Sequence, residues 1–284
     1  MKFSKFFVLM VLFAFLGLGI SNAQVKKTTG WKSPLFTIDI VGCYSLPIQE
    51  AKGNNIGEFF TFQNYGTKFG WGGGFNLKFG LGPQGQYRPY LTLGYTQLQN
   101  SDNSTAYIKN NIISNGYPFT DGTVPATGPG NSEIFLRVPY IGAGFEYAVT
   151  TADKKKRKWY PFFGVEFLMS VIAGTYRQVS NQAPSGNAPG VETAYTIKSD
   201  VRLGIGGSLG ATVRLGKYAG ITFGGKYKLY NLIGKKSDFL NEENKMNLLD
   251  KKDTGLHNLL SKDRNIGVIE FYLGATIFLG KTKK

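Results

Sequence analysis

Large apolar residues alternate with small or polar residues along most of the chain after residue 33. In the clearest run, Phe69 to Leu81, nearly every odd position is large and apolar and most even positions are Gly, Asn or Lys. Because successive side chains of a β-strand point to opposite faces, this period of two predicts strands with one apolar and one polar face. The predicted strands are 34–46, 69–81, 87–98, 133–149, 159–177, 195–215, 220–230 and 264–280.

Charged residues keep almost entirely to one phase of this alternation. Arg137, close to a strand end, is the single charge on the apolar phase. The opposite phase carries Asp39, Lys78, Arg88, Glu146, Glu166, Lys198, Asp200, Arg202, Arg214, Lys226, Lys228 and Glu270. A membrane barrel turns its apolar face to lipid and keeps charges inside, whereas a soluble barrel does the reverse. The alternation alone fits both, so a soluble periplasmic barrel that binds an apolar ligand is an alternative.

The connections between the predicted strands favour the membrane barrel. The long connections are 47–68, 99–132, 178–194 and 231–263, and they alternate with the short connections 82–86, 150–158 and 216–219. Outer-membrane up-and-down barrels have long outer loops, short periplasmic turns and an even number of strands. Both ends of the predicted barrel fall on the short-turn side, as that topology requires. The segment Glu58–Phe62 in the first long connection leaves ten strands as an alternative to eight.

Aromatic residues on the apolar phase gather near the two ends of the strands. Tyr44, Trp71, Tyr95 and Tyr227 lie near the long connections, and Tyr147 and Trp159 lie near the short ones. Aromatic rings with polar tips prefer the boundary between membrane and water, so these residues are two candidate girdles. Many glycines share the charged phase, which fits the narrow interior of an eight-stranded barrel.

The first residues have the organisation of a secretory signal peptide. Lys2 and Lys5 precede the apolar run Phe6–Ile20, and Ser21 and Ala23 place small residues before a cleavage site after Ala23. At about 1.5 Å per residue the run is too short for a hydrocarbon core of about 30 Å, which disfavours the alternative of a membrane anchor. The predicted organisation is therefore a cleaved signal peptide, 1–23, a short periplasmic segment, 24–33, a barrel, 34–280, and a basic tail, 281–284.

Composition removes several kinds of chemistry from the 284-residue chain. A single Cys excludes a disulfide framework and a Cys-based zinc site, and a single His excludes a multi-His metal site. We therefore expect no cofactor and no metal. The formal net charge of +15 and the basic run 154–158 raise nucleic acid as a partner. Because the chain is predicted to be exported and the basic run has no aromatic stacking platform, we expect no contact with nucleic acid. We instead expect contact with acidic phospholipid heads or an envelope protein.

Catalysis has one weak candidate. His257 lies four residues from both Asp253 and Ser261 in the last long connection, and a helical turn there would bring the three onto one face. A polar loop that happens to contain His is the simpler interpretation, so we expect no enzyme activity. The charges predicted for the interior, seven basic and five acidic, are expected to pair and fill the lumen.

The predicted signal peptide, eight strands and alternating loops resemble the small outer-membrane barrels of the outer membrane protein A and X type. More narrowly, the chain resembles the outer-membrane β-barrel proteins of Bacteroidetes-like bacteria, which include PorT-like proteins. The resemblance covers about Pro34 to Gly280 and is architectural. It implies an eight-stranded antiparallel up-and-down barrel in the bacterial outer membrane, with both mature termini periplasmic. It also implies contact with outer-membrane lipid and with the barrel assembly machinery, which reads an aromatic terminal strand such as Phe271–Phe278.

These expectations lead to one preferred function and two others. The preferred function is a barrel with a filled lumen that has a structural or interaction role through its outer loops. The second is porin-like passage of small solutes, and the third is a lipid-modifying enzyme that uses His257.

Overall fold

The computed structural model describes residues 34–54, 56, 64–82, 84–102, 130–149, 159–180, 192–235, 245–248, 250 and 263–280. The predicted signal peptide with its cleavage site after Ala23, the segment 24–33 and the tail 281–284 lie outside these residues and stay predictions. The segment Glu58–Phe62 also lies outside them.

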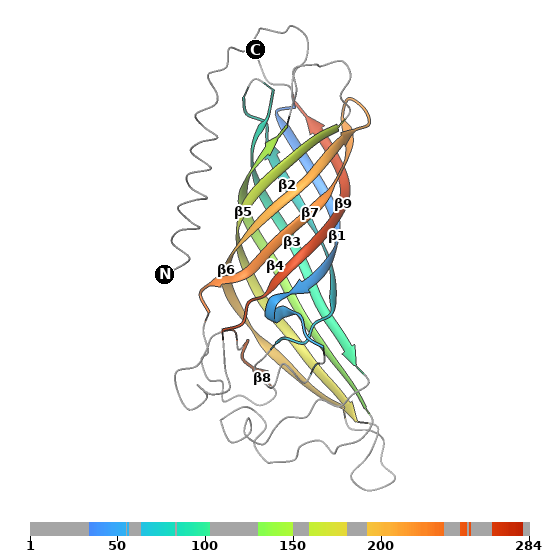
Figure 1. Cartoon of the computed structure of the whole chain (residues 1–284), viewed down its shortest axis with the longest axis vertical. Helices are drawn as coiled ribbons and strands as arrows, with labels where there is room; N and C mark the ends of the chain where they lie inside the picture. The colour runs from blue at the N-terminus through green and yellow to red at the C-terminus, as the bar shows by residue number, and fades with distance from the viewer. Residues whose placement is uncertain are drawn as a thin grey trace. The chain divides into compact units, whose positions relative to one another are not determined.

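Eight long, tilted strands form a closed antiparallel barrel (Figure 1). They are β1 (Phe36–Ile48), β2 (Phe69–Phe79), β3 (Tyr87–Asp102), β4 (Gly130–Ala148), β5 (Trp159–Ser180), β6 (Glu192–Arg214), β7 (Ala219–Ile233) and β9 (Gly267–Leu279). Neighbours in the chain pair with one another around the barrel, and β1 pairs with β9 to close it. The predicted eight-stranded up-and-down barrel is therefore confirmed.

Two small elements accompany the long strands. The 3-10 turn η2 (Gln49–Ala51) follows β1, and the two-residue strand β8 (Lys245–Met246) pairs in parallel with Thr196 and Ile197 of β6. Among the described residues, no helix has the length and hydrophobicity needed to cross a membrane.

The register places both ends of the barrel on one side. Phe36, at the start of β1, lies opposite both Phe79 at the end of β2 and Leu279 at the end of β9. The connections at this end, after β2, β4 and β6, have 7, 10 and 4 residues, whereas those at the other end, after β1, β3, β5 and β7, have 20, 27, 11 and 33. We refer to these as the short-turn end and the long-loop end.

The outer face of the barrel is apolar and its interior is polar over most of the strand length. Outward side chains such as Phe167, Leu209 and Leu273 are 67%, 69% and 64% exposed. Their inward neighbours in sequence, Glu166, Ser208 and Tyr272, are buried. A sheet in water has the opposite arrangement, with apolar side chains inside.

This polarity reverses towards the long-loop end of β4, β5 and β6. The inward residues there form an apolar core that includes Leu98, Ile134, Leu136, Val138, Ile172, Tyr176, Tyr195 and Ile197. The outward residues there include Arg137, Arg177 and Lys198. This part of the sheet therefore has the polarity of a protein surface in water.

A β-bulge in β6 reverses the orientations that regular alternation gives to Ile197 and Lys198. Ile172 lies opposite Asp200, whereas Gly174 lies opposite Ile197, so Lys198 and Ser199 together face the single residue Ala173. The extra residue changes the phase of the strand. Regular alternation from Val201 and Leu203 would turn Ile197 outward, but it is buried, and Lys198, predicted to face inward, is exposed, so the predicted orientation of Lys198 was wrong.

Two inward glycines make room for aromatic rings that cross the interior. A Cβ atom on Gly94 would lie 2.3 Å from the ring of Tyr140, and one on Gly144 would lie 2.4 Å from the ring of Tyr90. Real Cβ atoms do not approach other atoms so closely. The missing side chains let Tyr140 and Tyr90 reach charged groups inside the barrel.

Candidate functional site

Buried ion pairs occupy the interior near the short-turn end. Lys78 Nζ lies 2.8 Å from Asp39 Oδ2 and also pairs with Glu146. The second oxygen of Glu146 lies 3.1 Å from Arg88 Nη1, and the Thr276 hydroxyl donates to Asp39 over 2.7 Å. The Lys78–Glu146 pair links β2 to β4, which are not neighbours, whereas the other contacts of this group join neighbouring strands.

A second group of ion pairs lies further along the interior. Lys228 Nζ lies 2.8 Å from Glu270 Oε2 and donates to the Tyr140 hydroxyl over 2.6 Å. The other oxygen of Glu270 accepts from Thr96 at 2.8 Å and from Tyr230 at 3.0 Å. Because Tyr140 is on β4 and Lys228 is on β7, this contact crosses the barrel.

A looser pair connects the two groups. Lys226 Nζ lies 3.5 Å from Glu166 Oε2, which also accepts from the Tyr90 hydroxyl at 3.1 Å. With this pair, four carboxylates in the interior face four cations: Asp39, Glu146, Glu166 and Glu270 against Lys78, Arg88, Lys226 and Lys228. The interior is electrically balanced, as buried charge requires.

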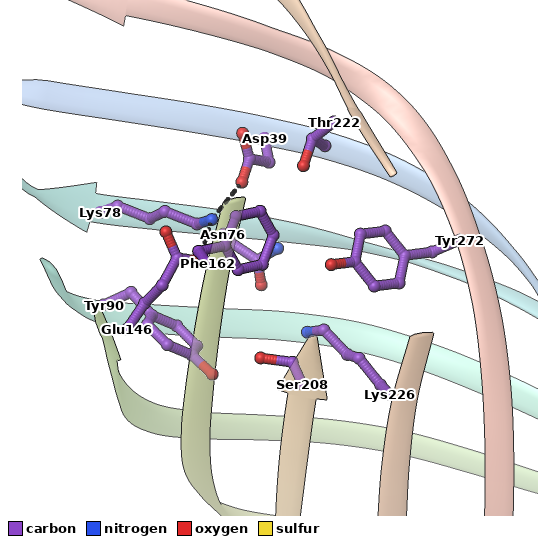
Figure 2. A pocket seen from close by; sticks show the side chains of 10 residues that line it. All are labelled: Asp39, Asn76, Lys78, Tyr90, Glu146, Phe162, Ser208, Thr222, Lys226 and Tyr272. Carbon is purple, nitrogen blue, oxygen red and sulfur yellow. Dashed lines mark hydrogen bonds and ion pairs between the residues drawn. The ribbon is translucent and has the colours of Figure 1, made fainter. Parts of the chain in front are cut away.

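A small cavity lies between these ion pairs (Figure 2). Its lining residues come from all eight barrel strands and include Lys78, Glu146 and Lys226. It has room for about one water molecule. The hydroxyls of Thr222 and Tyr272 line it and have no partner among the described residues, so the cavity is polar.

Nine of the twelve charged residues predicted for the interior are buried: Asp39, Lys78, Arg88, Glu146, Glu166, Arg202, Lys226, Lys228 and Glu270. Lys198 is outside the barrel because of the bulge. Arg214 is half-buried at the short-turn end, where it donates to the carbonyls of Gly216 and Lys217. Asp200 is also half-buried and pairs with Arg202 at 2.9 Å.

Arg202 belongs to a separate cluster at the mouth of the barrel, on the long-loop side. Its Nε and Nη2 atoms lie 2.8 and 3.0 Å from the two carboxylate oxygens of Asp250. Asn231 Nδ2 donates to Asp250 over 3.1 Å and to the carbonyl of Arg264 over 2.9 Å. Asp250, Asn231 and Arg264 are fully buried. The sequence analysis missed Asp250 because the long connection that holds it has no strand periodicity.

Residues of the first and last long connections pack together at this mouth. The Arg264 guanidinium lies 4.2 Å from the centre of the Tyr65 ring, and the Tyr65 hydroxyl donates to the carbonyl of Leu248 over 2.6 Å. Burial raises the pKa of the Tyr65 hydroxyl, so it remains a hydrogen-bond donor. Ala51, Ile56 and Leu248 are buried in the same apolar core.

The predicted aromatic residues lie on the outer face. Tyr44 is opposite Trp71 in the register, and the rings of Trp71 and Tyr95 are 5.9 Å apart near the long-loop end. Tyr227 also lies near that end, in β7. Near the short-turn end, the ring of Tyr147 is 5.6 Å from Tyr87, and Trp159 is exposed. Their role as girdles stays a prediction.

The residues described include neither the candidate catalytic residues nor a group that could bind a metal ion. His257, Ser261 and Asp253 lie outside the described part of the chain, so the hydrolase hypothesis is untested. No group of three or more His, Cys, Asp or Glu residues within that part could hold a metal ion.

Neither a protein-family model nor a curated protein matches the sequence. Solved structures with a similar fold include Neisserial surface protein A, at 10% identity and a TM-score of 0.42, covering 86% of this chain and 97% of that chain. They also include Ail, the attachment invasion locus protein of Yersinia pestis, at 9% identity and a TM-score of 0.36, covering 86% and 99%. The outer membrane protease OmpT from Escherichia coli has 13% identity and a TM-score of 0.35, covering 89% and 99%. Each of these TM-scores is below 0.5, so the fold is established from the strand register described above. We infer no activity for this chain from these structures.

Proposed function

We propose that this chain is an integral protein of the bacterial outer membrane, with a filled lumen and a structural or interaction role through its outer loops. Its partners are outer-membrane lipid, the barrel assembly machinery during insertion and an envelope protein that contacts the loops or turns. Both mature termini are periplasmic in this proposal, on the side of the short turns.

The orientation of apolar and charged side chains carries the proposal. Large apolar residues such as Ile40, Phe167 and Leu273 are exposed around the barrel, while carboxylates and ammonium groups are buried inside it. Soluble proteins rarely expose contiguous apolar surface larger than a few hundred Å². Hydrocarbon chains would cover this face at no cost, and a closed barrel satisfies the backbone hydrogen bonds that lipid cannot.

Three observations support a lumen that does not conduct. The Lys78–Glu146 ion pair and the hydrogen bond from Lys228 to Tyr140 span the interior between strands that are not neighbours. The cavity lined by Lys78, Glu146 and Lys226 has room for about one water molecule. At the long-loop end, the cluster around Asp250 and the apolar core close the mouth.

Fractionation and gel mobility test the membrane placement. The full chain should sediment with the outer membrane and migrate faster on a gel without heating than after boiling, because a folded barrel resists detergent. Recovery of a soluble, monomeric protein in the periplasmic fraction would contradict the proposal.

Conductance tests the filled lumen. The purified protein should produce no stable openings in planar lipid bilayers, even when gel mobility shows that it is folded. Stable single-channel steps would favour porin-like passage of small solutes instead, while leaving the membrane placement intact.

A further inference from the structure

Three neighbouring strands end their outward apolar runs in the same row of the barrel wall. On β4, β5 and β6 these runs end at Pro139, Val171 and Val201, which are all exposed or largely exposed. The next outward residues towards the long-loop end are Arg137 on β4, Ala173 on β5, and both Ser199 and Lys198 in the bulge of β6. Arg137 is opposite Ala173 in the register, and Ala173 is opposite Lys198 and Ser199 in the bulge.

In this row, Arg137 and Lys198 therefore lie on opposite sides of the small residue Ala173. Adjacent strands are about 4.8 Å apart, so the backbones of Arg137 and Lys198 are separated by roughly 10 Å across β5. Both side chains are long, exposed and outward, and the methyl group of Ala173 leaves the space between them open. Neither side chain has a hydrogen-bond or ion-pair partner in the part of the chain that the structure describes.

The neighbouring basic residue Arg177 differs from Arg137 and Lys198 because it has an ion-pair partner. Arg177, two outward positions further along β5 than Ala173, has Glu133 at 3.5 Å. Arg137 and Lys198 face no such carboxylate among the described residues. They therefore form an unneutralised pair at the edge of the apolar face.

We propose that Arg137 and Lys198 bind the phosphate of a lipid headgroup, with the acyl chains of the same lipid along Pro139, Val171 and Val201. The proposal rests on the membrane placement proposed above. A guanidinium offers paired N–H donors that match phosphate oxygens, and an ammonium adds a compact positive charge. The continuity of the cation pair with the apolar runs below it favours a lipid over a free phosphate ion.

The bulge in β6 makes this arrangement possible. If β6 kept its sequence but ran as a regular strand through Ser199, the phase of Val201 and Leu203 would place Lys198 inside the barrel, as the sequence pattern suggests. The bulge turns Lys198 to the side of Arg137, and it also lets Ile197 join the apolar core.

Lipid retention in native mass spectrometry tests the site. The full chain in a neutral detergent is titrated with phosphatidic acid and, separately, with phosphatidylcholine, whose quaternary ammonium offsets its phosphate. Wild type should retain phosphatidic acid at clearly lower lipid concentration. R137Q/K198Q should weaken phosphatidic acid binding by about fivefold for each cation removed, which is the factor that about 1 kcal/mol per basic residue represents.

Two variants serve as controls. K52Q/K68Q removes the same charge from exposed lysines beside β1 and β2 and should leave binding unchanged. R137K/K198R keeps both charges and should retain most of the binding. Faster migration of each unheated variant on a gel shows that it is folded before its binding is compared.

Three results would overturn the site. They are equal retention of the two lipids by wild type, an equal loss of binding in R137Q/K198Q and K52Q/K68Q, and full displacement of phosphatidic acid by millimolar inorganic phosphate. A wild-type chain found in the outer membrane that shows any of these disproves only the lipid site. A chain that is soluble in the periplasm disproves the membrane placement itself.

Discussion

At the scale of single residues, each interior charge depends on one or two partners. Lys228 is fully buried and is held by Glu270 and Tyr140. A buried charge that loses its partner keeps its desolvation penalty without the compensating attraction. The pairs therefore make the barrel sensitive to single substitutions even where they add little net stability.

Lys228→Met should destabilise the barrel by about 3–5 kcal/mol, because it leaves the Glu270 carboxylate buried with hydroxyl partners only. The double variant K228M/E270Q removes both charges and should recover much of that loss. Urea unfolding followed by gel mobility measures both effects. If Lys228→Met and K228M/E270Q were equally destabilised, the attraction between Lys228 and Glu270 would not be what stabilises these two buried charges.

Gly94→Ala should cost about 1–3 kcal/mol, because the new methyl group would displace the Tyr140 ring from Lys228. Gly42→Ala is a matched control, since a Cβ atom on that glycine meets nothing within 4 Å. The same urea experiment compares the two variants. If Gly42→Ala is the more destabilising one, the interior is not the crowded side of the sheet.

At the scale of strands, the period of two predicted the barrel well, because outward apolar residues and inward polar residues alternate along the regular stretches of each strand. In β2, Phe69, Trp71 and Phe75 face outward and Lys78 faces inward, as their positions alone indicate. The same rule failed at Lys198, because nothing in the local pattern of β6 marks an extra residue. It also missed the apolar interior around Leu136 and Ile172, where both faces of a strand carry large residues and the period gives no orientation.

Deletion of Ser199 should be tolerated, within about 1 kcal/mol, because it removes the extra residue and leaves Ile197 inward and Lys198 outward. Deletion of Leu209, in a stretch of the same strand that is regular against both neighbours, should prevent folding, because it inverts every side chain on one side of the gap. Gel mobility of refolded protein compares the two deletions. Normal folding of both would show that the β6 register is not fixed by its two faces.

At the scale of the whole molecule, residues of the first and last long connections pack together at the mouth of the barrel. Tyr65 and Leu248 are joined by a hydrogen bond although they are 183 residues apart. Such contacts could not be predicted from the sequence, because the loops have neither a period nor a motif that pairs Asp250 with Arg202. Only the closed barrel brings them together.

Asp250→Ala should loosen the last long connection, because Arg202 would remain buried with fewer acceptors and Asn231 would lose one. We expect faster trypsin cleavage after Lys251 or Lys252 in folded protein, with the barrel itself still resistant. Lys68→Ala, an exposed change at the same end, is the comparison. Cleavage at the wild-type rate would show that the Arg202–Asp250 contact does not hold this connection.

The seam between β1 and β9 determines when the barrel can close. The first strand, β1, pairs with the last, β9, along the whole of Phe36–Ile48. One edge of β1 therefore stays unpaired until the C-terminal strand is available. Until that moment β1 and β7 each present an unpaired edge, which is the feature that invites pairing with other chains. A chain that stopped before Gly267 would keep both edges open, so loss of β9 should make the protein prone to pairing with other chains.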